Sequence, residues 1–206
     1  MKLYSAHRAP NPRRVLMFLC EKNVTSIEIV NLDLNQGGHR TPEFLGKSPL
    51  AKVPALALDD GRVLSETRAI CTYLEGWQPV PNLMGEGFEE RAFIEMADRR
   101  AELYLFAGIG NAIRHTHPGL AVLENPQFPD FGKSQASKVM ELLKWYEQLL
   151  SQQDWMAGSR FTIADITAFC ALEFARGLMK LVPGALGLNF LQAWRDRVNE
   201  RPSARA

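Results

Sequence analysis

A stretch rich in proline and glycine, residues 76–87 (GWQPVPNLMGEG), separates two parts of the sequence that have different hydrophobic patterns. Before it, short alternating segments typical of strands are mixed with helical segments, whereas after it every apolar segment has the period of a helix. The two prolines and three glycines of the stretch favour an irregular connection. The sequence therefore predicts an α/β domain over residues 1–77, a linker over 78–87 and an all-helical domain over 88–206.

The α/β domain is predicted to begin with a βαβ unit. KLYS (2–5) and SIEIVNLDL (26–34) have the alternation of strands, and the helix between them is predicted to start with Asn11 as N-cap and Pro12 at its first position. A crossover of this length implies parallel strands joined by a right-handed connection. The polar segment that follows, residues 35–52, is expected to be a loop with at most a short helix.

A hairpin and a second long helix complete the domain in the order βαβ, ββα. VPALALDDGRVLSE (53–66) alternates on both sides of an Asp59-Asp60-Gly61 turn, which predicts two antiparallel strands. ETRAICTYLEGW (66–77) then has the period of a helix. The buried faces of the two helices are predicted to consist of Val15, Leu16, Phe18 and Leu19, and of Ala69, Ile70, Tyr73 and Leu74.

The second domain is predicted to contain helices only. Their expected ranges are 88–116, 134–152, 161–178 and 189–201, with a proline-rich loop over 117–133. In RFTIADI, Thr162 is a favoured N-cap and Asp165 follows three residues later, which is the pattern of a capping box. We therefore interpret this motif as structural.

Composition excludes several classes of protein. With 46% hydrophobic and 23% charged residues the chain is typical of a globular protein, and a net charge of +1 gives no reason to expect nucleic acid or an anionic membrane as partner. The chain has no apolar run long enough to span a bilayer, and MKLYSAHRAP leads directly into a strand.

Cys20, Cys71 and Cys170 are isolated in apolar patterns, which favours buried thiols in a reducing cytoplasm. Neither a metal-ligand cluster nor a glycine-rich phosphate loop is found, so no metal or nucleotide is expected.

Three motifs together resemble the cytosolic glutathione transferases, in which a thioredoxin-like half is joined to a helical half. They are KVPALALDDGRVLSETRAICTYLE (52–75), RFTIADITAFCALEFA (160–175) and the pair of ends KLYSAHRAPNPRRV and LQAWRDRVNERPS. RAPNPRRV and the later His-Pro-Gly stretch resemble the atypical fungal and bacterial branch that lacks a catalytic Tyr, Ser or Cys. The resemblance implies glutathione as co-substrate and a homodimer.

The resemblance assigns the binding of glutathione to residues of the first domain. It implies a cis peptide at Val53-Pro54, which turns the backbone of Val53 outwards to pair with the cysteinyl unit. It also implies that Glu66 and Thr67 hold the γ-glutamyl amino and carboxylate groups. The two residues are also suited to capping the following helix, and both roles are compatible.

A basic loop precedes these residues. His39, Arg40 and Lys52 match basic positions that hold the glycyl carboxylate of glutathione in the plant and bacterial types. A loop with three basic side chains can also be merely solvated. Because this loop adjoins the Val-Pro strand, we interpret it as a carboxylate clamp.

The first helix begins without an obvious nucleophile. Ala9 and Pro12 occupy the positions of the two cysteines of a thioredoxin, so thiol–disulfide exchange is excluded there. Tyr4 lies within the first strand and fits a buried ring better than a catalytic one, while Ser5 stays a candidate. Glutathione supplies the thiol itself, and a helix N-terminus together with the Asn11 amide can favour its thiolate.

A second candidate for thiol activation lies in the helical domain. His115 or His117, in IRHTHPGL, could hold a water that accepts the thiol proton, because imidazole titrates near neutrality. The atypical branch uses a histidine and a serine in this way, and the sequence contains no convincing match for the serine. The acceptor-substrate pocket is expected to be apolar and to include Ala9, Pro10, Tyr104, Phe106 and Ile109, with Met179 as a further candidate.

These observations predict a glutathione transferase that adds the glutathione thiolate to a small hydrophobic electrophile, in the manner of a detoxification enzyme. The alternatives are a glutathione-binding or regulatory protein that has lost catalysis, and a glutathione-dependent isomerase or ether-cleaving enzyme. All of them share the first binding site.

Overall fold

A computed structural model describes residues 1–7, 9–122 and 124–206. The chain forms two compact units, one made of Met1–Asn82 with Pro202–Ala206 and the other of Leu83–Arg201. The last residues pack on the first long helix of their unit, where Arg13 Nη2 donates to the carbonyl oxygen of Ala204 at 2.7 Å. The sequence gives no sign of this return to the first unit.

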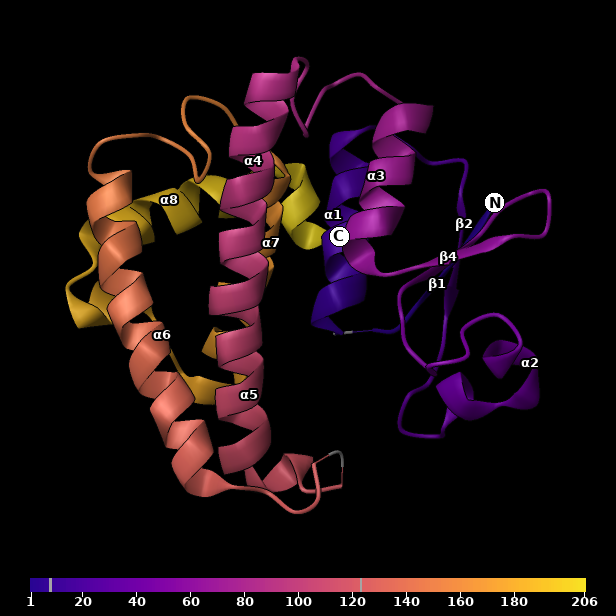
Figure 1. Ribbon diagram of the computed structural model, residues 1–206, viewed down its shortest axis with the longest axis horizontal. Coiled ribbons are helices and arrows are strands. Elements are labelled where there is room, and N and C mark those ends of the chain that lie inside the picture. The colour runs from indigo at the N-terminus through magenta and orange to yellow at the C-terminus, as the bar shows by residue number, and fades with distance from the viewer. Residues whose placement is uncertain (8, 123) are drawn as a thin grey trace. The chain divides into compact units, whose positions relative to one another are not determined.

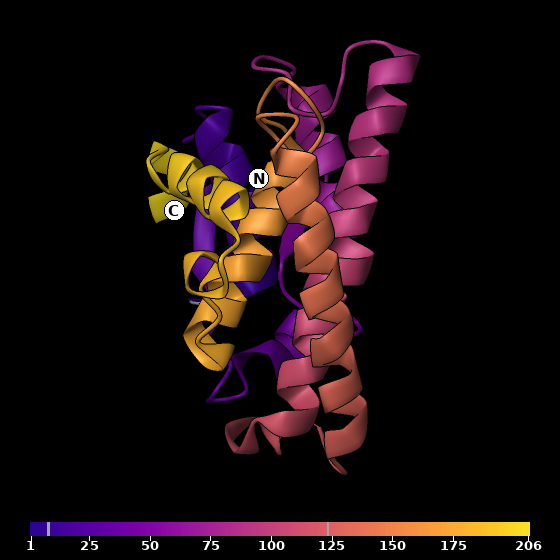
Figure 2. The same ribbon diagram turned by 90° about the vertical axis from the view of Figure 1, so that its left-hand side faces the viewer.

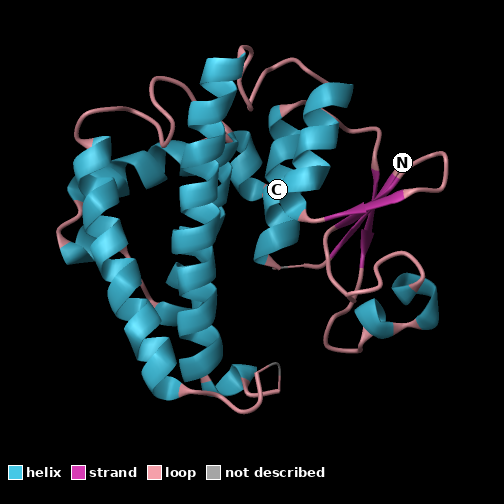
Figure 3. Ribbon diagram, in the orientation of Figure 1, coloured by secondary structure: helices cyan, strands magenta, loops and turns pink. Residues whose placement is uncertain are grey.

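The first unit contains a four-stranded sheet in the order β2-β1-β3-β4. The strands are drawn in magenta in Figure 3. The strands are β1 (Lys2–Ser5), β2 (Glu28–Asn31), β3 (Ala55–Ala57) and β4 (Val63–Ser65). β1 and β2 are parallel, whereas β1–β3 and β3–β4 are antiparallel. The predicted βαβ, ββα order and the thioredoxin-like fold are thus confirmed.

Helices α1 (Pro10–Glu21) and α3 (Thr67–Trp77) lie side by side on one side of this sheet (Figure 1). The predicted short helix is α2 (Pro42–Leu45). Details of both predicted buried faces were wrong. On the first helix, Met17 is buried and Leu16 only half-buried. On the second, Cys71 is buried, whereas Ala69 is exposed and Tyr73 only half-buried.

The start of α1 also differs from the prediction. The N-cap is Ala9 rather than Asn11, and Pro10 and Pro12 both lie inside the first turn. Proline is tolerated there because the first N–H groups of a helix have no intrahelical partner. Asn11 therefore lies one residue inside the helix, with its side chain exposed.

The second unit is helical. Its elements are α4 (Phe88–Arg100), a π-helical segment (Ala101–Phe106), α5 (Ala107–Thr116), α6 (Pro129–Leu150), α7 (Ile163–Met179) and α8 (Asn189–Asn199). α4, the π-helical segment and α5 form one continuous rod over the predicted range, and α6 runs beside this rod (Figures 1 and 2). α6 begins at Pro129, five residues before the predicted start, because proline is well suited to a first helical position. No helix in the described parts of the chain is long and apolar enough to cross a membrane.

A buried carboxylate joins three segments of this unit. The predicted capping box forms at the start of α7, where Thr162 N–H donates to Asp165 Oδ2 at 2.9 Å. Asp165 Oδ1 accepts from Trp194 Nε1 of α8 and from the backbone N–H of Met156, both at 2.9 Å. Burial raises the pKa of Asp165 to about 6, although its hydrogen bonds act in the opposite direction.

Candidate active site

Three strands bring their site residues to one end of the sheet. Ala55 pairs with Tyr4 of β1 and with Ser65 of β4. If both pairings are continued by one residue, Pro54 is next to Ser5 on one side and Glu66 on the other. Because β1 and β4 both end here, the helices that follow them, α1 and α3, direct their N-termini to this end. Two helix N-termini make the end of the sheet attractive to anions.

Val53 offers an unused strand edge at this end. The Val53–Pro54 peptide is cis, as predicted. The backbone N–H and C=O of Val53 form no hydrogen bond with any described residue, and Val53 is only half-buried. The preceding loop is held by the buried Ser48, whose hydroxyl donates to the Lys52 carbonyl oxygen at 2.9 Å. An extended peptide could therefore pair with Val53 without displacing any of these contacts.

Glu66 and Thr67 lie at the start of α3. Glu66 is exposed and has φ 66° and ψ 119°, a conformation disfavoured for residues with a Cβ atom. Backbone strain of this kind costs about 1–3 kcal/mol and is concentrated at functional sites. Thr67 is buried and is the first residue of α3. The first turn of α3 offers N–H groups to a ligand carboxylate, and the Glu66 side chain offers a carboxylate to an ammonium group.

The loop before β3 carries three basic residues, His39, Arg40 and Lys52, which interact electrostatically. His39 and Arg40 share a single helical turn, Gly38–Arg40, and Lys52 is exposed. Desolvation, followed by the positive charges of Arg40 and Lys52, lowers the pKa of His39. At neutral pH the positive charge of the group therefore rests on Arg40 and Lys52. The His39 Nδ1 atom is buried and has no hydrogen-bond partner among the described residues.

Replacing Lys52 with alanine is expected to weaken glutathione binding about tenfold at low salt, the equivalent of one charge-assisted hydrogen bond. The loss should shrink as salt concentration rises, because an exposed charge is screened. Lys47→Ala is the matched control, since Lys47 in the same loop pairs with Glu43 at 3.1 Å. Calorimetric titration measures both variants, and equal losses would contradict a specific role for Lys52.

The start of α1 presents few backbone donors. Pro10 and Pro12 have no N–H group, and Arg13 N–H donates to the Ala9 carbonyl oxygen at 3.2 Å. The backbone N–H of Asn11 makes no hydrogen bond with a described residue. Asn11 thus carries a side-chain amide and a backbone N–H that has no partner among residues 1–7, 9–122 and 124–206. Ala9 and Pro10, predicted to contact the acceptor substrate, are half-exposed beside it.

Ser5 is placed less favourably for catalysis. It is 0% exposed, and its hydroxyl has no partner among the described residues. A ligand could reach this hydroxyl only if the end of β1 moved. Tyr4, which the sequence predicts as a buried ring, is only half-buried and packs against Phe44 with 5.5 Å between ring centroids.

Each of the two histidines of the helical unit uses one ring nitrogen to hold the loop between α5 and α6. His117 Nδ1 accepts from Gly119 N–H, and His115 Nδ1 accepts from Phe128 N–H, both at 3.1 Å. The His115 Nε2 atom lies 3.9 Å from Glu124 Oε1. This arrangement leaves Nε2 of each ring as the nitrogen that could hold a water.

The apolar candidates of the helical unit fall into two groups. Tyr104 is 63% exposed, and Phe106 stacks on Phe174 of α7 with 6.5 Å between ring centroids. Ile109 is 0% exposed and belongs to the core of the unit. Tyr104 and Phe106 are therefore the better candidates for contact with an acceptor substrate.

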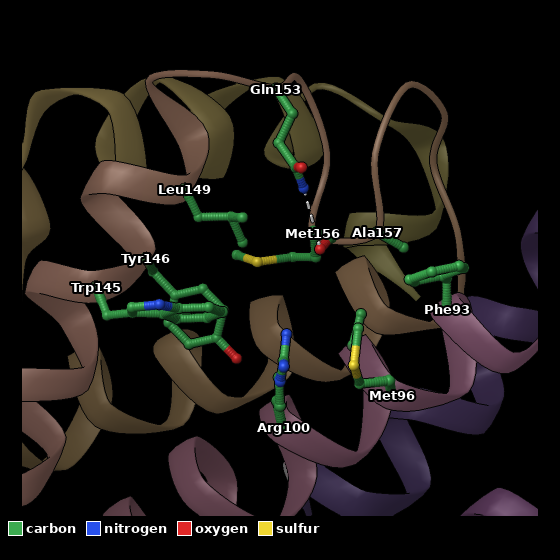
Figure 4. Close-up of a pocket in the computed structure, with 10 residues that line it drawn as sticks. Phe93, Met96, Arg100, Trp145, Tyr146, Leu149, Gln153, Met156 and Ala157 are labelled. Carbon is green, nitrogen blue, oxygen red and sulfur yellow. Dashed lines mark hydrogen bonds between the residues drawn. The ribbon is translucent and has the colours of Figure 1, made fainter.

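A cavity that the sequence did not suggest lies between α4 and α6 (Figure 4). Its volume is about 130 Å³, and its walls include Phe93, Met96 and Trp145. The Arg100 guanidinium lies 5.4 Å from the centre of the Trp145 ring. The Tyr146 hydroxyl points toward the Arg100 side chain (Figure 4), and burial raises the pKa of this hydroxyl.

Among the described residues, no group of His, Cys, Asp or Glu side chains is arranged to hold a metal ion.

Comparisons with known proteins agree with this architecture. Residues 9–76 match the family model of the glutathione S-transferase N-terminal domain, and residues 121–202 match that of the C-terminal domain. Glutathione S-transferase 2 of Saccharomyces cerevisiae is 34% identical over 207 residues, which span 100% of this chain and 88% of that protein. The chain belongs to the glutathione S-transferase family.

Solved structures show the same relationship. A glutathione S-transferase domain-containing protein of Marinobacter aquaeolei superposes with a TM-score of 0.93, at 40% identity, over 98% of this chain and 99% of that chain. Gtt2 of Saccharomyces cerevisiae superposes with a TM-score of 0.91, at 34% identity, over 100% of this chain and 99% of that chain. Glutathione is accordingly the substrate that the family assigns to this fold.

Proposed function

We propose that this glutathione transferase adds the thiolate of glutathione to small hydrophobic electrophiles. The observation that carries the proposal is the backbone of Val53, which has no hydrogen-bond partner among the described residues. Val53 lies between Lys52 and Pro54, the residue that the sheet register brings next to Glu66. Glutathione is an extended tripeptide with one ammonium and two carboxylate groups. The end of the sheet offers a complementary group for each of them.

Each part of glutathione has a proposed partner. The cysteinyl unit pairs with the backbone of Val53 beside Pro54. The ammonium binds the Glu66 carboxylate, and the γ-glutamyl carboxylate binds Thr67 and backbone N–H groups in the first turn of α3. The glycyl carboxylate binds Arg40 and Lys52, with His39 as a neutral hydrogen-bond donor. This arrangement directs the sulfur to the start of α1.

The thiol needs only modest activation. Its ordinary pKa is about 8.5, and a downward shift of one to two units raises the ionised fraction at pH 7 from about 3% to between about a quarter and three quarters. The backbone N–H and side-chain amide of Asn11 are the proposed donors to the thiolate. His115 and His117, the other candidates from the sequence, are not assigned the proton, because a neutral ring whose Nδ1 accepts an N–H bond carries its proton on Nε2 and can only donate to a water there. On the first unit, the electrophile is proposed to contact Ala9 and Pro10.

Titration of the thiolate absorbance in the glutathione complex tests the proposal. The bound thiol is expected to ionise about one to two pH units below the free thiol. If glutathione binds but the pKa of its thiol is unshifted, the result would favour a glutathione-binding protein without catalysis. The absence of a nucleophile at Ala9 and Pro12, the cysteine positions of a thioredoxin, supports this alternative. A shifted titration without conjugation of any electrophile would favour the isomerase or ether-cleaving alternative.

A cytoplasmic homodimer with a role in detoxification is also part of the proposal. Several large apolar side chains of the second unit are exposed, among them Phe88 at 91%, Phe93 at 54% and Met96 at 39%. A second copy of the chain could cover exposed apolar side chains such as these. The three cysteines form no disulfide, which fits a reducing compartment; Cys71 and Cys170 are buried as predicted, whereas Cys20 is half-buried.

A further inference from the structure

A buried arginine contacts the residue proposed to act on the thiol. Arg14 lies one turn after Asn11 on α1, and its side chain is enclosed, with 1% of the residue exposed. Its Nη1 atom donates to Asn11 Oδ1 at 3.3 Å. Asn11 itself is exposed, so one end of its amide is anchored in the protein and the other is free.

The chemistry of the two groups determines how the amide is oriented. A guanidinium group has donors only, so the amide can face it only with its oxygen. The Nδ2 group must then point away from Arg14. A positive charge on the oxygen side also withdraws electron density from the amide, which strengthens Nδ2 as a donor.

We infer that Arg14 is a positioning residue for thiol activation, because it holds the Asn11 amide with Nδ2 turned outward as a donor to the glutathione thiolate. This inference rests on the proposed function. Asn11 contacts the sulfur, whereas Arg14 acts through Asn11. Without Arg14 the exposed amide is free to rotate and offers either its oxygen or its nitrogen to the sulfur. An amide oxygen disfavours a thiolate.

A double-mutant cycle on thiol ionisation tests the inference. The thiolate absorbance of bound glutathione is titrated for the wild type, Asn11→Ala, Arg14→Met and the double variant. Arg14→Met is expected to lower the ratio of ionised to neutral thiol about tenfold at a pH below the bound pKa. In the Asn11→Ala background the same change should lower it less than twofold. Arg14→Lys, which keeps a charged donor, should restore part of the effect.

Two controls separate positioning from a structural role. Arg13→Met removes the neighbouring arginine, which donates to the Ala204 carbonyl oxygen, and should leave thiol ionisation unchanged. S-Methylglutathione has no ionisable thiol, so its affinity should change less than twofold in Arg14→Met. A large loss of this affinity would overturn the inference, since it would place Arg14 in the tripeptide site.

The outcomes distinguish this inference from the proposed function. An unshifted thiol in the wild type would contradict the proposed function. A shifted thiol in the wild type together with independent, additive effects of Asn11→Ala and Arg14→Met would overturn only the role of Arg14. If Arg14→Met does not fold, Arg14→Lys in both backgrounds replaces it. Asn11→Asp, which keeps the acceptor for Arg14 and loses the donor, should then match or exceed the effect of Asn11→Ala.

Discussion

Replacing Glu66 with glutamine is expected to weaken glutathione binding by about 10- to 100-fold, the range of a charge-assisted hydrogen bond lost from a binding site. Glutamine keeps the size of the side chain and removes the charge that the γ-glutamyl ammonium requires. Because Glu66 is exposed, the fold should be unaffected. Calorimetric titration with glutathione measures the loss, and the melting temperature checks the fold.

The strained backbone of Glu66 provides a second, independent readout. Glutamine and alanine retain the Cβ atom that makes φ 66° and ψ 119° unfavourable, whereas glycine does not. Glu66→Gly should therefore melt at a higher temperature than Glu66→Ala, although both bind glutathione weakly. Such a result would mean that strain is maintained at this position for the sake of the carboxylate.

Asn11→Ala is the comparison that tests the division of roles within the site. It removes a donor to the sulfur and leaves the proposed contacts of the tripeptide ends intact. Its glutathione affinity should change far less than that of Glu66→Gln, while thiol ionisation falls. Equal losses of affinity in the two variants would contradict the assignment of the γ-glutamyl group to Glu66.

Much of the fold was predictable because side-chain periodicity reports burial directly. The sheet, the hairpin and the helices of both units follow from alternation or helical period. The π-helical segment Ala101–Phe106 was not predictable, because the apolar pattern continues through it. The N-cap of α1 was predicted wrongly because Asn11 has a favourable propensity, and the two prolines beside it fit the first turn equally well.

The candidate site was predictable in part for a similar reason. The resemblance supplied Val53, Pro54, Glu66 and Thr67, and the pairing register brings them to one end of the sheet. The contact of Arg14 with Asn11 was not predictable, because a basic residue on a helix is normally solvated. The lowered pKa of His39 likewise depends first on desolvation and then on the charges of Arg40 and Lys52, and only the folded loop buries the ring and brings Lys52 near it.

Replacing Asp165 with alanine is expected to reduce the free energy of unfolding by about 3–5 kcal/mol, a large part of the total for a protein of this size. The change leaves buried donors without an acceptor: the backbone N–H groups of Met156 and Thr162 and the indole N–H of Trp194. Each such group costs about 1–3 kcal/mol. Urea unfolding followed by circular dichroism measures the loss, and a change below about 1 kcal/mol would contradict a structural role for Asp165.

The pH dependence of stability tests the same residue without removing its contacts. The pKa of Asp165 is about 6 in the folded protein, against an ordinary value of 3.8. Between these values the folded chain binds more protons than the unfolded chain, so stability due to this group falls as pH rises from about 4 to 6 and stays lost above that. Asp165→Asn cannot titrate. The stability of the wild type relative to Asp165→Asn should therefore decrease by about 3 kcal/mol over this interval, and a constant difference would mean that the hydrogen bonds of Asp165 keep it ionised throughout.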